Sequence, residues 1–297
     1  MADTTISSIA YLNGYLLLLQ DNGKFIVMDT SYKRVDSLEA RFLPLNYSFL
    51  IRYHDTLFVG TKDKVYYLDN DFSQVVYNVK QRRYGEVLFE DSAYLIYGCC
   101  AGEWGGSIFF FNKQTKKTFS YFATCANQVL RFGHSYVVCN NLAHLSEHMS
   151  FLVVNDPTTL YEITDEEQKY NCNWYTTVDS LKNYWQVSKK GAVRFYEAYN
   201  AMSYISFPFR DSLYSILSVP KATVLAVHRG DTTIIRDTLM DKRIPFHETK
   251  VIEAENKKVC LYRLTEGSPV AAYWTRGNNT GMIVVCGNRI DFIDKQN

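Results

Sequence analysis

The sequence predicts an all-β fold, and three observations support this prediction. The chain of 297 residues contains 23 tyrosines and 18 phenylalanines but only 6 prolines, and aromatic residues suit the half-buried surface of a sheet. Short apolar segments alternate with turn residues along the chain, and one kind of segment returns at a regular spacing. With 47% hydrophobic residues the chain can also bury a large core.

The recurring segment is a short apolar run that ends in Asp, Asn or Glu. Its seven copies are 24–29, 64–69, 107–112, 150–155, 192–197, 232–237 and 289–294. Five of the six steps between copies fall within the ~40–45 residues typical of a four-stranded propeller blade. The regular spacing therefore favours a propeller over a β-sandwich.

Each copy is expected to be the third strand of a blade. A second apolar run and a tight turn precede most copies, as Tyr15–Gln20 and Asp21–Gly23 precede the first. Asn-Gly and related pairs adopt the positive φ angles that tight hairpins require. Further candidate strands lie before each hairpin and after most of them. The sequence thus predicts a seven-bladed β-propeller of four-stranded antiparallel blades, in one domain spanning residues 1–297.

The ring is expected to close by pairing of the N-terminal and C-terminal strands. The chain ends soon after the copy at 289–294, which leaves the last blade without an outer strand. Residues 4–8, Thr-Thr-Ile-Ser-Ser, can supply that strand.

These recurring segments resemble the third strand of WD40-type blades, and the resemblance covers essentially the whole chain. The residue before the acid or amide is Met28, Leu68, Phe111, Val154, Tyr196, Arg236 or Ile293. The resemblance implies a scaffold for protein interactions without catalytic activity.

The charge balance excludes the broad basic surface of a nucleic-acid-binding protein. The chain has 32 basic and 31 acidic residues, for a net charge of +1, whereas binding to phosphate backbones needs an excess of Lys and Arg. The apolar run 15–19 is too short to cross a membrane. We therefore expect neither a nucleic acid nor a membrane as partner.

The cysteines favour a reducing compartment. There are seven, an odd number, with no Cys-x-x-Cys and no regular spacing, so a disulfide framework is not expected. Adjacent Cys99 and Cys100 point to opposite faces of a strand. The prediction is a cytoplasmic protein, and an exported protein whose signal peptide was removed remains the alternative.

Two short motifs match known functional patterns. The segment 144–148, His-Leu-Ser-Glu-His, spells a zinc-protease pattern, but such a site needs both histidines on a helix, and a surface loop within the fourth hairpin is favoured. Arg229-Gly-Asp231 spells an integrin-binding tripeptide, and a hairpin turn explains it better. No catalytic residue, cofactor or metal is predicted.

Two functional classes remain open. The favoured one is a non-enzymatic protein-interaction module, which acts as a scaffold, a complex subunit or a neutralising binding partner. The alternative is an enzyme or small-ligand-binding propeller that acts through its central channel.

The partner is expected to bind at a rim of expanded loops on one face, formed by 99–106, 140–149 and 164–173. Loops on a rigid scaffold concentrate binding residues, and tryptophan is enriched among interface anchors. The acidic residues of this rim favour a partner with a basic surface. The predicted partner-binding residues are Glu103, Trp104, His144, Glu147, His148, Asp165, Glu166 and Glu167.

Overall fold

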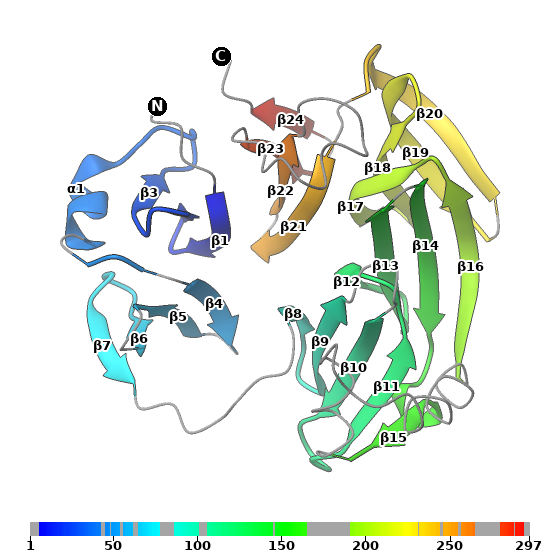
Figure 1. Cartoon of the computed structure of the whole chain (residues 1–297), viewed down its shortest axis with the longest axis horizontal. Coiled ribbons are helices and arrows are strands. Elements are labelled where there is room, and N and C mark those ends of the chain that lie inside the picture. Colours follow the sequence, from blue (N-terminus) through cyan, green and yellow to red (C-terminus); the bar gives the residue numbers. More distant parts are fainter. Residues whose placement is uncertain are drawn as a thin grey trace. The chain divides into compact units, whose positions relative to one another are not determined.

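The computed structural model of the chain describes fourteen ranges: 6–42, 45–47, 49–53, 56–61, 65–77, 86–100, 106–144, 146–164, 191–230, 232–243, 246–254, 257–264, 280–287 and 289–293. The described residues lie mostly in strands, which Figure 1 labels in chain order. The chain divides into two compact units, described separately below. Unit 1 contains Met1–Arg82, Lys250–Thr265 and Arg276–Asn297; unit 2 contains Arg83–Thr249 and Glu266–Thr275.

The described strands form six sheets. Sheet 1 consists of β1 (Ile6–Leu12), β2 (Tyr15–Gln20) and β3 (Phe25–Met28). Sheet 2 consists of β4 (Phe49–Tyr53), β5 (Thr56–Gly60), β6 (Val65–Leu68) and β7 (Gln74–Tyr77). Sheet 3 consists of β8 (Glu86–Glu90), β9 (Tyr94–Cys100), β10 (Gly106–Asn112), β11 (Thr118–Phe122) and β15 (Tyr161–Ile163).

The other three sheets have four strands each. Sheet 4 consists of β12 (Ala126–Phe132), β13 (Ser135–His144), β14 (Ser146–Val154) and β16 (Ala192–Tyr199). Sheet 5 consists of β17 (Met202–Phe209), β18 (Ser212–Val219), β19 (Ala222–Arg229) and β20 (Thr232–Met240). Sheet 6 consists of β21 (Phe246–Ala254), β22 (Lys257–Leu264), β23 (Thr280–Cys286) and β24 (Arg289–Ile293). Short helical turns are α1 (Asp36–Glu39), η1 (Ala40–Phe42) and η3 (Pro157–Thr159).

In unit 1, sheet 1 is buried on both faces. Its alternate residues Leu17, Leu19 and Val27 pack with sheet 2, whereas Leu16 and Leu18 pack with β22 and β23 of sheet 6. A strand that is covered on both faces needs apolar residues at every position. This explains the unbroken Tyr-Leu-Leu-Leu-Leu run of β2.

In unit 2, sheet 4 is buried on both faces in the same way. Val138 and Leu152 pack with sheet 3, and Val137, Met149 and Phe151 pack with sheet 5. Face-to-face packing of successive short-stranded sheets is the arrangement of propeller blades. The prediction of an all-β fold built from propeller blades is therefore confirmed.

The predicted number of seven blades is wrong. Five of the described sheets have four or five strands and form full blades, and sheet 1 has three strands. The copies at 150–155 and 192–197 were counted as two blades, but they lie in β14 and β16, which pair with each other in sheet 4. The later copies at 232–237 and 289–294 are likewise outer strands, β20 and β24.

The acid or amide at the end of β3, β6 and β10 caps the turn after the strand. Asp29 Oδ1 accepts hydrogen bonds from the backbone amides of Ser31 and Lys33 at 2.8 and 3.0 Å. Asp69 Oδ1 accepts from the amide of Ser73 at 2.8 Å. Asp and Asn stabilise turns in this way because their short side chains reach the backbone two residues ahead. Glu197, by contrast, lies inside β16.

The predicted pairing of the chain's terminal strands is not found among the described residues. β1, which includes residues 6–8 of the proposed closing strand, pairs with β2 instead. Sheet 6 completes its four strands with β21 to β24. β1 contacts sheet 6 through side-chain packing, because Ile9 and Tyr11 of β1 share a core cluster with Met282 and Val284 of β23.

The open edge of sheet 1 is covered by the segment that carries α1. The backbone amide of Val27 in β3 donates to Glu39 Oε1 at 3.0 Å, and the amide of Val35 donates to the Val27 carbonyl at 2.8 Å. Arg34 Nε also donates to Glu39 Oε1, at 2.9 Å. Covering an edge satisfies its backbone groups and prevents pairing with other chains.

Among the described residues, no helix has the length and hydropathy needed to cross a bilayer. Whether the two units form one domain stays a prediction.

Candidate functional site

The described part of the predicted binding region lies at one end of sheet 4. The hairpin between β13 and β14 reaches this end, since His144 pairs with Ser146. β16 finishes at the same end, because His148 pairs with Tyr199. We call this the rim end of sheet 4. The predicted rim residues Glu103, Trp104, Asp165, Glu166 and Glu167 lie outside the described residues.

The zinc-protease pattern at 144–148 forms a β-hairpin. β13 runs to His144 and β14 starts at Ser146, with Ala143 opposite Glu147 and Leu142 opposite His148. The expected long loop over 140–149 is therefore wrong, because strand pairing continues almost to the tip. His144 and His148 thus lie on paired strands and not on one helix, as a zinc protease requires. The described residues contain no group of three or more His, Cys, Asp or Glu placed to hold a metal ion.

His148 is held in place by two neighbours on β16. Its Nε2 lies 2.6 Å from Glu197 Oε1, and its ring centroid lies 4.9 Å from that of Tyr199. Tyr199 is 69% exposed, the highest value among the exposed large hydrophobic side chains of the described residues. The amide of Asn200 donates to the Glu147 carbonyl at 2.7 Å. This hydrogen bond fixes the backbone directly after Tyr199. The exposed phenol ring is therefore carried by a backbone that is held in place.

Glu147 does not add free negative charge to this surface. Its carboxylate forms an ion pair with the guanidinium of Arg243, which follows β20 in the sequence. Arg243 Nε donates to Ser218 Oγ at 3.2 Å, and burial lowers the pKa of Arg243 from its ordinary value. The prediction that Glu147 belongs to an acidic rim is therefore wrong, because the distant Arg243 that neutralises it leaves no signal in the local sequence.

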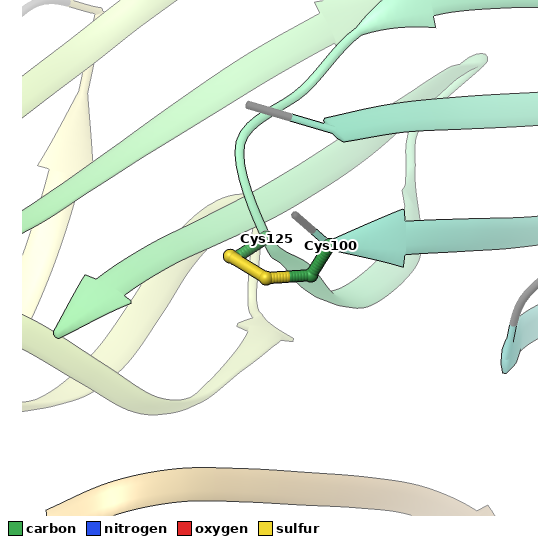
Figure 2. Close-up of a disulfide and its surroundings, with 2 residues drawn as sticks. All are labelled: Cys100 and Cys125. Carbon is green, nitrogen blue, oxygen red and sulfur yellow. A yellow bond between two sulfur atoms is a disulfide. The ribbon is translucent and has the colours of Figure 1, made fainter. Parts of the chain in front are cut away.

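A disulfide lies beside this end of sheet 4 (Figure 2). It joins Cys100, the last residue of β9, to Cys125, directly before β12. The Cys125 carbonyl accepts a hydrogen bond from the amide of Asn141 in β13 at 3.1 Å. The disulfide therefore links Cys100, the residue before segment 101–105, to sheet 4. Cys99 is also disulfide-bonded.

The sequence did not predict a disulfide framework, whereas the structure joins Cys100 to Cys125. Counting and spacing of cysteines missed the Cys100–Cys125 bond, because it links the end of one strand to the start of a strand in the next sheet. The packing around it is close: a Cβ added to Gly106, which begins β10, would collide with the carbonyl oxygens of Cys99 and Ala123. The side chains of Cys139 and Cys260 are buried.

A serine–histidine pair in sheet 5 has the distances of a hydrolytic dyad. Ser215 Oγ lies 2.9 Å from His228 Nε2, and His228 Nδ1 lies 2.7 Å from Thr233 Oγ1. However, Ser215 is 0% exposed and His228 is 5% exposed. Burial also lowers the pKa of His228 to about 4. A nucleophile must reach its substrate, so this arrangement is a buried polar network rather than a catalytic site.

No family model matches the chain, and no curated protein matches it. Among solved structures, BamB from Moraxella catarrhalis matches at 10% identity and a TM-score of 0.40, over 84% of this chain and 78% of that one. Kluyveromyces lactis Hsv2 matches at 12% identity and a TM-score of 0.40, over 97% and 92%. A chain of the mitotic checkpoint complex matches at 10% identity and a TM-score of 0.43, over 100% and 79%. These values carry no argument about function, and the fold assignment rests on the strand pairing and packing described above.

Proposed function

We propose that the protein is a non-enzymatic interaction module that binds another protein through the rim end of sheet 4. The observation that carries this proposal is the exposure of Tyr199 on a base fixed by His148 and Glu197. Tyrosine offers a large contact area and a hydroxyl at low entropic cost, which is why it is enriched at binding surfaces. The bonds of its neighbours add to the rigidity of the site, so little ordering remains to be done on binding.

Segments 101–105 and 165–167 are proposed to extend this surface. The disulfide between Cys100 and Cys125 roots the first segment next to sheet 4. With Glu147 paired with Arg243, the acidic character of the surface depends on Glu103, residues 165–167 and Glu197, which contacts His148. A partner with a basic surface fits this arrangement, and its association rate is expected to fall as salt screens the charges.

The disulfide also bears on where the protein acts. Disulfides persist in oxidising compartments and are rare in the cytosol. Of the two locations that the sequence left open, the Cys100–Cys125 bond favours an exported protein. We therefore include an oxidising compartment in the proposal.

A capture experiment with matched variants tests the proposed surface. Tagged wild-type protein, Tyr199→Ala and Ile235→Ala are expressed in the native cells, and bound proteins are quantified by mass spectrometry. Ile235 is 58% exposed on β20 and serves as the control. Loss of an interface anchor costs about 2 kcal/mol or more, so Tyr199→Ala should reduce recovery of the partner more than tenfold while Ile235→Ala retains it. Equal recovery with all three proteins, at unchanged melting temperatures, refutes the proposed surface.

A further inference from the structure

A chain of hydrogen-bonded side chains crosses all four strands of sheet 5. It continues from the pair between His228 and Ser215 described above. Ser215 Oγ in β18 lies 2.7 Å from Ser206 Oγ in β17, which lies 3.1 Å from Ser203 Oγ. At the other end His228 in β19 contacts Thr233 in β20. The hydroxyl and ring positions are therefore linked from the inner to the outer strand.

Ser203 and Ser206 of this chain also attach sheet 5 to sheet 4, through their backbone groups. Gln128 Nε2 donates to the Ser206 carbonyl at 2.7 Å, and the Ser206 amide donates to Gln128 Oε1 at 2.8 Å. Asn141 forms the equivalent pair with Ser203, at 2.6 and 2.9 Å. All four hydrogen bonds are buried. The serine hydroxyls that connect to His228 thus belong to the residues that hold the two sheets together.

The described side chains that contact the imidazole of His228 carry no formal charge. β14 and β16 of sheet 4 contribute the rings of Phe151 and Tyr196, with centroids 4.7 and 5.1 Å from that of His228. β18 and β20 contribute the hydroxyls of Ser215 and Thr233. Tyr196 is the titratable side chain of these four, and none of them carries a carboxylate. A protonated ring would therefore have no counter-charge among these contacts.

We propose that His228 makes the attachment of sheet 5 to sheet 4 sensitive to acid, so that its protonation releases β17 from Gln128 and Asn141.

The reason is that a charged imidazole donates from both nitrogens. Neutral His228 donates from one nitrogen and accepts at the other, which suits a chain of hydroxyls that point in one direction. Protonation requires both Ser215 and Thr233 to accept. In the tautomer in which Ser215 donates to Nε2, Ser215 must then turn its hydroxyl away from the ring, and the hydroxyls of Ser206 and Ser203 reorient with it. The charge also stays buried without a partner, which favours an opened state in which water reaches the ring.

The direction of the effect follows from the two pKa values. Burial lowers the pKa of His228 in the closed state to about 4, whereas a solvated histidine titrates near 6.5. The open state therefore binds more protons between these values, and closure is weakened as the pH falls through this window. On this basis the open population at pH 5 is on the order of 30-fold higher than at pH 8.

Amide hydrogen exchange of the full chain tests the proposal. Exchange is measured between pH 8 and 5 by mass spectrometry, with correction for intrinsic rates, in wild type, His228→Gln and His134→Gln. Glutamine can donate and accept but does not titrate in this range. His134 is exposed in the turn before β13 and provides the matched control. Peptides of β17 and β12 should open on the order of 30-fold more at pH 5 in wild type and His134→Gln, and should show no such rise in His228→Gln.

Two outcomes overturn the proposal: a rise that persists in His228→Gln, or no rise in wild type. If His228→Gln does not fold, exchange of the ring C–H of His228 in wild type gives its titration directly. Opening of β17 must then follow the same titration, and opening at a different pH refutes the link.

Discussion

Gln128 and Ser206 are joined by two buried hydrogen bonds that connect sheet 4 to sheet 5. The side-chain amide of Gln128 binds the Ser206 backbone as a neighbouring strand would, with one donor and one acceptor. Gln128→Ala leaves a buried amide and a buried carbonyl unpaired, and we expect a loss of about 2–4 kcal/mol in the free energy of unfolding. Urea titration measures this loss. Gln114→Ala, at an exposed position, should change stability little, and equal effects of both variants contradict the assigned role of the Gln128 pair.

Glu39 is expected to stabilise unit 1 through its contact with the edge of β3. It accepts from the Val27 amide at 3.0 Å and from Arg34 Nε at 2.9 Å. Glu39→Gln keeps an acceptor oxygen but loses the charge, whereas Glu39→Ala removes both interactions. We expect Glu39→Ala to cost about 1–3 kcal/mol and Glu39→Gln to cost less, measured by denaturant unfolding. If the glutamine variant is as unstable as the alanine variant, the hydrogen bond to the strand edge contributes little.

The sequence predicted the class of fold and most strands, but not the number of blades. A short apolar run indicates a strand but not its place in the sheet. The outer strands β16 and β20 carry the same short pattern as third strands, although Ile234 and Ile235 of β20 are exposed. The terminal residue separates only the copy at 192–197, because the outer-strand copies at 232–237 and 289–294 also end in Asp. Asp29 and Asp69 cap turns, whereas Glu197 is too long for this turn chemistry and lies within a strand. Separating Asp and Asn from Glu would have assigned the copy at 192–197 to an outer strand.

The candidate site was predicted in part. The sequence placed Glu147 and His148 in one hairpin, and the structure retains that placement. It missed Glu197 and Tyr199, because their position beside His148 depends on the pairing of β14 with β16 across an intervening stretch of chain. Arg243 and the Cys100–Cys125 bond were missed for the same reason. Contacts between strands distant in sequence leave no local pattern.

Ile9 is expected to stabilise the packing of sheet 1 on sheet 6. Its side chain is 3% exposed and belongs to the cluster that contains Val259, Met282 and Val284. Ile9→Ala removes buried carbon atoms and leaves a cavity, so we expect a loss of about 2–5 kcal/mol in the free energy of unfolding. Ile235→Ala is the same substitution at an exposed site and should change stability by less than about 0.5 kcal/mol. A similar loss in both variants contradicts the packing of Ile9 against sheet 6.

The Cys100–Cys125 bond is expected to stabilise the oxidised protein and to be detectable in a digest without reductant. Mass spectrometry should find the peptides of Cys100 and Cys125 joined. Because Cys99 is also disulfide-bonded, the mass of the joined species falls by two hydrogen atoms for each disulfide. The cross-link closes a segment with a sequence separation of 25 residues, and restricting the unfolded chain over such a length stabilises a protein by about 3 kcal/mol. The double variant Cys100→Ser, Cys125→Ser should therefore melt lower than wild type by several degrees. Adding a reductant should lower the melting temperature of wild type more than that of the double variant.

Cys286→Ser replaces a free, partly exposed cysteine and should leave this difference intact. A digest in which Cys100 and Cys125 are each alkylated as free thiols contradicts the bond, and with it the assignment to an oxidising compartment.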